Sequence, residues 1–148
     1  MRIRALLILA AATAATAGCG NSEPAIPMSQ AGNVTTVPAD GAGPDLSKEE
    51  FTDLTADDAV AVQARDNAFV EPYITVKAGT EVDFTNKGRN QHDVVPVVDG
   101  AFAEIPVADF QPKDSGSVTF TVPGDYPYYC TLHGTKDKGM IGAVRVLQ

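Results

Sequence analysis

The feature that most constrains this chain is a short segment near its C-terminal end that holds a thiol, an imidazole and a thioether. Cys130, His133 and Met140 lie there between two runs of residues typical of β-strands. One further histidine, His92, lies upstream. The chain has only two histidines and two cysteines. A single metal site could therefore use both histidines and one of the two cysteines.

These residue types match the ligand set of a blue-copper electron-transfer centre, which has one thiolate, two imidazoles and a weak axial methionine. Thiolate is soft and suits Cu(I), whereas imidazole binds both oxidation states of copper. A weak thioether leaves the site nearly trigonal, so neither state is strongly preferred and electron transfer needs little rearrangement. Zinc fits less well, because structural zinc sites close a tetrahedron of cysteine, histidine or carboxylate ligands.

Each candidate ligand also has an ordinary structural explanation when it is taken alone. A lone cysteine is often a small buried hydrophobe. A lone histidine is more often a surface residue than a ligand, and Met140 could simply belong to the core. The combination favours a metal site, because only two residues separate Cys130 from His133 and strand-like sequence lies on both sides.

Residues 1–18 have the pattern of a secretion signal, with Arg2 and Arg4 before an apolar run that is short for a membrane span. The run ends at Cys19, in a sequence that resembles a bacterial lipobox. A lipidated Cys19 would anchor the exported chain to the outer face of the cytoplasmic membrane or hold it in the periplasm. Two other readings are a spare thiol in a discarded signal and a disulfide between Cys19 and Cys130.

Residues 19–58 are predicted to form a tether. The segment is rich in proline, glycine and small polar residues, and residues 20–58 carry eight acids and one base. Such a composition buries too little apolar surface to fold alone. We therefore expect a self-repelling spacer between membrane and domain; the alternative is a docking tail for a basic partner.

From residue 59 onward, short runs with β-strand patterns alternate with turn residues. The runs cover residues 60–65, 73–76, 81–86, 92–95, 117–122, 126–130 and 142–147. Residues 96–114 are irregular and hold three prolines. Several short strands separated by turns predict an all-β fold, an antiparallel sandwich spanning residues 59–148.

Residues 59–148 resemble a cupredoxin of the plastocyanin-like group. The run from Thr119 to His133 is similar to the family's penultimate strand and ligand loop, and the run from Met140 to Val146 is similar to its final strand. His92 matches the upstream ligand, after a polar turn. The resemblance implies a Greek-key β-sandwich with one type 1 copper at one end, held by His92, Cys130, His133 and Met140. It also implies a buried His92 and a partly exposed His133.

The chain departs from the plastocyanin-like pattern at two places. Six residues separate His133 from Met140, where four are common. An asparagine that ties the two ligand loops together often follows the upstream histidine, and here Asp93 follows it. The residue that ties the loops could be Asn86, Asn90 or Asp93 itself.

The expected function is that of a monomeric carrier of single electrons and not of an enzyme, because two histidines cannot build a second copper site of the multicopper-oxidase kind. Redox partners would dock transiently near His133, beside Leu132. Lys136 and Lys138 favour an acidic partner, whereas the net charge of −8 favours a basic one. No basic patch suggests nucleic-acid binding. The alternative function is copper delivery or sequestration without electron transfer.

Overall fold

The structure is a computed structural model that describes residues 43–57 and 59–148. The predicted signal segment, Cys19 and much of the predicted tether lie outside these residues. Within the described ranges, no helix has the length and apolar character needed to cross a membrane. The predictions on lipidation and on the spacer therefore stay predictions.

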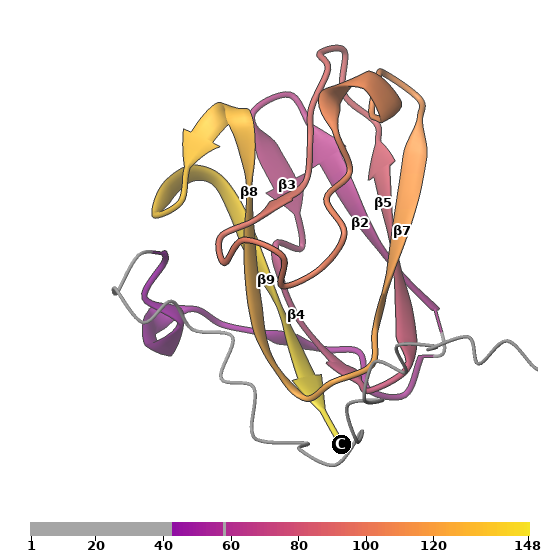
Figure 1. Cartoon of the computed structure of the whole chain (residues 1–148), viewed down its shortest axis with the longest axis vertical. Coiled ribbons are helices and arrows are strands. Elements are labelled where there is room, and N and C mark those ends of the chain that lie inside the picture. The colour runs from indigo at the N-terminus through magenta and orange to yellow at the C-terminus, as the bar shows by residue number, and fades with distance from the viewer. Residues whose placement is uncertain (1–42, 58) are drawn as a thin grey trace, which may run out of the picture. The chain divides into compact units, whose positions relative to one another are not determined.

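Two sheets face each other in the described part of the chain (Figure 1). One has the strand order β1-β4-β9-β8-β6 and the other has the order β3-β2-β5-β7. The strands are β1 (Thr52–Asp53), β2 (Ala59–Arg65), β3 (Ala68–Val70), β4 (Tyr73–Lys77), β5 (Thr80–Asn86), β6 (Val95–Pro96), β7 (Ser115–Phe120), β8 (Gly124–Thr135) and β9 (Lys138–Leu147), with 3-10 turns η1 (Leu46–Lys48) and η2 (Val107–Asp109). The predicted all-β sandwich is confirmed.

The sheets are mixed, and the expectation of a purely antiparallel sandwich was wrong. β1 pairs parallel with β4, β4 with β9, and β2 with β5. The hairpin of β8 and β9 and the pair of β5 and β7 are antiparallel. Connections that cross between the two sheets bring strands that are distant in sequence side by side, and such neighbours can run in the same direction.

The folded region extends into the segment predicted as tether. β1 joins the edge of the first sheet, and the Phe51 ring lies 5.6 Å from the Tyr73 ring. The Arg145 guanidinium lies over the same Phe51 ring at 3.9 Å, while it also forms a two-pronged ion pair with Asp125. These contacts hold residues 51–53 against β4 and β9, so ordered structure begins before Ala59.

Alternating side chains of the two sheets fill a single core. β2 and β5 bury every second residue, as their sequences predicted. Tyr128 lies at the centre of the core, edge-on to Phe69 at 5.0 Å and to Phe84 at 5.3 Å. Its hydroxyl donates to the Pro72 carbonyl at 3.1 Å, so the one polar atom of this ring is satisfied.

Gly142 is the point of closest approach between β9 and the Tyr128 ring. A Cβ at this position would lie 2.5 Å from Cζ and the hydroxyl of Tyr128, and closer still to the Pro72 carbonyl oxygen. We expect Gly142→Ala to lower the free energy of unfolding by roughly 1–3 kcal/mol, as overpacking does in rigid cores. Urea denaturation measures this change.

Ser117→Ala is a suitable control for Gly142→Ala. Ser117 is exposed on β7, and such surface substitutions usually change stability by less than about 0.5 kcal/mol. Equal stability of the two variants would show that β9 can shift away from Tyr128 at little cost.

Candidate metal centre

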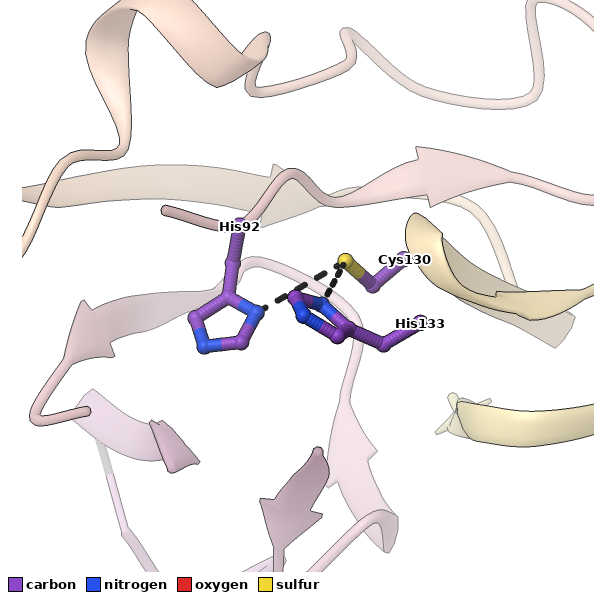
Figure 2. A group of neighbouring side chains, drawn as sticks. All are labelled: His92, Cys130 and His133. Atoms are coloured by element: carbon purple, nitrogen blue, oxygen red, sulfur yellow. Dashed lines mark hydrogen bonds between the residues drawn. The ribbon is translucent and has the colours of Figure 1, made fainter. Parts of the chain in front are cut away.

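The structure brings His92, Cys130 and His133 together at one end of the sandwich. Their ligand atoms all lie within 4.8 Å of one another. Cys130 Sγ lies 3.7 Å from Nδ1 of His92 and 3.5 Å from Nδ1 of His133 (Figure 2). His92 and Cys130 are buried, whereas His133 is partly exposed. This is the burial that the resemblance implied for the two histidines.

A first-row metal ion fits between these atoms. With bonds of about 2.3 Å to sulfur and about 2.0 Å to nitrogen, sulfur and nitrogen lie about 3.5 Å apart at a tetrahedral angle and about 3.7 Å apart at a trigonal angle. The two sulfur–nitrogen distances are 3.7 and 3.5 Å. The distances from the Cys130 sulfur to the two imidazole nitrogens are therefore those that such an ion requires.

His92 is held by the segment between β5 and β6. Its backbone N–H donates to the Phe110 carbonyl at 3.3 Å. Its ring is fully buried, and Nε2 has no hydrogen-bond partner in the described part of the chain. Gly88 packs against this atom, since a Cβ there would lie 3.3 Å from Nε2. The other ring nitrogen, Nδ1, faces the Cys130 sulfur.

Cys130 and His133 lie where β8 departs from regular pairing. The register between β8 and β9 shifts between Tyr129 and Gly134, so the residues in between are not held in the ladder. A bulge of this kind bends the strand and re-aims its side chains. It allows the side chains of Cys130 and His133, three positions apart, to meet at the same point.

A β-hairpin accounts for the long stretch of chain between His133 and Met140. Gly134 pairs with Gly139 and Thr135 pairs with Lys138, so the six intervening residues form the tip of a β-hairpin and not an open loop. Gly139 has a φ of +88°, which glycine adopts without strain. Met140 opens the buried part of β9 and is fully buried. The extra length is thus taken up in paired backbone before Met140 is reached.

Asp93 ties the two ligand segments together. Its carboxylate accepts the Thr131 backbone N–H at 2.7 Å and the Thr131 hydroxyl at 2.5 Å. Asn86 has a different role, because its amide donates to the Asn90 and Phe110 carbonyls and so shapes the segment that carries His92. Sequence left the choice between these three residues open, since each lies close to His92 in the chain.

Lys136 fastens the hairpin tip to the neighbouring loop. Its ammonium donates to the Val97 carbonyl at 2.9 Å and lies 3.5 Å from the Asp99 carboxylate. The Lys136 charge is thus engaged in two contacts, while its side chain stays 41% exposed; its role in steering a partner stays a prediction. Lys138 is exposed, and its side chain forms no hydrogen bond or ion pair within the described residues.

A shallow depression of about 480 Å³ lies next to His133. Its lining residues are Arg89, Asn90, Gln91, Gln111, Pro112, Leu132 and His133. Leu132 is 46% exposed, as the sequence led us to expect, but most of the other lining side chains are polar. The face around the exposed histidine is therefore more polar than the expected apolar patch.

Burial dominates the electrostatics of the site. It raises the pKa of the Cys130 thiol, because the thiolate loses its hydration. It also lowers the pKa of His92 from its ordinary value of 6.5, with a smaller contribution from the neighbouring His133. A bound cation reverses this preference at the thiol, since metal coordination stabilises the thiolate.

Replacing Lys136 by methionine tests whether the hairpin tip is fastened. We expect Lys136→Met to lower the free energy of unfolding by about 0.5–1.5 kcal/mol, the usual value of one hydrogen bond. Amide hydrogen exchange in the hairpin should accelerate. Lys138→Met, which removes an equal charge from the same hairpin, should change neither quantity; identical behaviour of both variants would rule out the contact with Val97.

The lowered pKa of His92 gives the metal-free protein a pH dependence. The unfolded chain binds a proton at this imidazole more readily than the folded chain does, so stability is present above the ordinary pKa and falls as the pH drops below about 6.5. Urea denaturation between about pH 7.5 and 5.5 measures the effect. The free energy of unfolding should change less steeply with pH in His92→Gln. If the steepness is unchanged, a group other than His92 causes the pH dependence.

Comparison with known proteins supports copper as the cofactor. Residues 56–147, well over half of the chain, match the family described as copper binding proteins, plastocyanin/azurin family. Chloroplastic plastocyanin of Oryza sativa subsp. indica is 35% identical over 79 residues, which cover 49% of this chain and 50% of that protein. Plastocyanin of Solanum crispum is 33% identical over 88 residues, which cover 53% of this chain and 87% of that protein. The chain spans about half the length of the chloroplastic relatives that it matches.

Solved structures give the same picture of the fold. An amicyanin mutant in its Cu(I) form superposes with a TM-score of 0.52 at 29% identity, covering 64% of this chain and 87% of that one. A copper-containing nitrite reductase from Thermus scotoductus superposes with a TM-score of 0.50 at 25% identity, covering 61% of this chain but 22% of that one. The chain belongs to the plastocyanin/azurin family of copper-binding proteins.

Proposed function

We propose that this protein is an exported, membrane-tethered type 1 copper protein that carries single electrons between redox partners. The observation that carries the proposal is the buried Cys130 thiol with the two imidazole nitrogens 3.7 and 3.5 Å away. His92, Cys130 and His133 would hold the copper, and Met140 would supply a fourth, weaker thioether ligand. Bound copper supplies a one-electron couple between Cu(II) and Cu(I).

The surrounding structure favours rapid electron exchange. Cys130 lies in the longest strand of the domain, and Asp93 fastens the segment of His92 to the residue that follows Cys130. Ligands that are fixed by their neighbours rearrange little when the charge at the site changes. His133 is the one member of the trio with solvent access, so it is the natural point at which an electron enters or leaves.

A partner would dock over the depression beside His133. Leu132 offers a single exposed apolar contact, and the polar side chains around it favour an encounter that is small and quickly reversed. Such an interface suits a carrier, because each partner must leave before the next one arrives. No partner is needed to complete the site itself, which agrees with a monomeric carrier.

Carriage of electrons fits better than catalysis. The nitrite reductase that superposes on this fold is a much longer chain, of which the match covers 22%. The present chain has two histidines in all, and both lie in the one cluster. A second histidine-based copper site within this chain would have no imidazole left to use.

Export and tethering rest on the sequence. Residues 1–18 carry the pattern of a signal, and Cys19 lies at the end of a lipobox-like run. After export, the domain would stay anchored to the membrane. It would reach other redox proteins of that membrane by diffusing around its anchor. The acidic segment that follows would keep the domain extended from the surface.

Visible and EPR spectra of the full chain loaded with Cu(II) test the electron-transfer role. We expect an intense thiolate-to-copper band with a small hyperfine splitting, lost in Cys130→Ser and shifted in Met140→Ala. Thr135→Ala, on the exposed hairpin tip, should leave both spectra unchanged. A colourless protein that binds Cu(I) tightly and shows no reversible one-electron wave would instead support copper delivery or sequestration.

A further inference from the structure

Asp93 is a buried carboxylate beside the metal site. It directly follows His92 in the chain and is 4% exposed. In residues 43–57 and 59–148, no lysine, arginine or histidine forms a salt bridge with it. Acidic side chains are rarely buried without a cationic partner, because the charged form loses its hydration. The position of Asp93 therefore calls for a reason beyond packing.

The two hydrogen bonds of Asp93 do not by themselves need a charge. Both donors, the backbone N–H and the hydroxyl, belong to Thr131. An asparagine could make the same contact, because its amide oxygen can accept the N–H and its NH₂ can donate to the hydroxyl oxygen. Joining the two segments thus explains a polar side chain at this position, but not a carboxylate.

We propose that Asp93 places a fixed negative charge next to the site and thereby lowers the reduction potential of the bound copper. The inference rests on the proposed electron-transfer function. Reduction lowers the positive charge of the ion by one unit. A nearby anion in a poorly hydrated environment stabilises the more positive, oxidised form more strongly than the reduced form. Asp93 is then a positioning residue whose charge acts on the ion through space.

The hydrogen bonds of Asp93 place this carboxylate beside both ligand segments. Asp93 directly follows His92, and it accepts two hydrogen bonds from Thr131, which directly follows Cys130. A charge in this position lies close to an ion held by the two segments, so its field acts on that ion.

The test compares reduction potentials of copper-loaded, full-length variants by voltammetry. Asp93→Asn keeps both contacts with Thr131 and removes the charge. We expect its equilibrium to shift toward Cu(I) by about tenfold or more, and each tenfold change corresponds to about 59 mV for a one-electron couple. The thiolate-to-copper band should keep its position, because the ligands are unchanged. Asp93→Ser provides a second neutral variant and should shift the potential in the same direction.

Two controls separate charge from structure. Asp109→Asn removes the same charge from an exposed position next to Phe110, and it should shift the potential far less because water and salt screen that site. Thr131→Val removes one hydrogen bond but leaves the carboxylate in place. It should lower the thermal stability without raising the potential.

The outcomes distinguish the inference from the function on which it rests. A wild-type chain without the thiolate-to-copper band would overturn the proposed function, and the inference with it. A blue wild-type protein whose potential is unchanged by Asp93→Asn and by Asp93→Ser would overturn the inference alone. If the reduction potential rose as much in Thr131→Val as in Asp93→Asn, the inference would also be overturned, because the contact and not the charge would then set the potential.

Discussion

The contact between Asp93 and Thr131 is the constraint on which the metal centre depends. The candidate ligands come from two segments that are far apart in sequence, and this contact joins the residue after His92 to the residue after Cys130. Without it, the segment of His92 would be held by the hydrogen bond from the His92 N–H to the Phe110 carbonyl and by the pairing of β6 with β8. With it, a shift of either segment must move the other, so the distances between thiol and imidazole are set by the fold and not by a metal alone.

The sandwich supplies the frame for this contact. β8 is fixed on one side by β9 and on the other by β6, and Tyr128 anchors its centre in the core. The register shift after Tyr129 then releases the strand at the point where the ligands must converge. Regular pairing resumes at Gly134, which returns the chain to β9 and to Met140. A short irregular segment between two well-held ends gives precise geometry without a large ordering cost at the site.

The sequence predicted the sandwich and the pairing of Cys130 with His133 because both depend on short-range patterns. The alternation in β2 and β5 and the spacing of Cys130 and His133 can be seen within a few residues. β1 escaped prediction because its two residues are exposed and polar, and only parallel pairing with β4 makes them a strand. The role of Asp93 escaped for a similar reason. Three polar residues near His92 were equally suitable, and the choice among them is made by Thr131, which lies 38 positions away in the chain.

The hairpin shows why the number of residues between two ligands is a poor measure of the space between them. Six residues separate His133 from Met140, yet two cross-strand pairs close most of that length onto itself. Lys136 then fixes the tip to the loop after β6. What remains to be spanned is the step from Gly134 to the backbone of Met140, where a Cβ on Gly134 would lie 2.8 Å from the Met140 nitrogen. A longer ligand loop therefore need not loosen the site: where the added residues pair with one another, they extend the sheet and leave the ligand end of the loop as short as before.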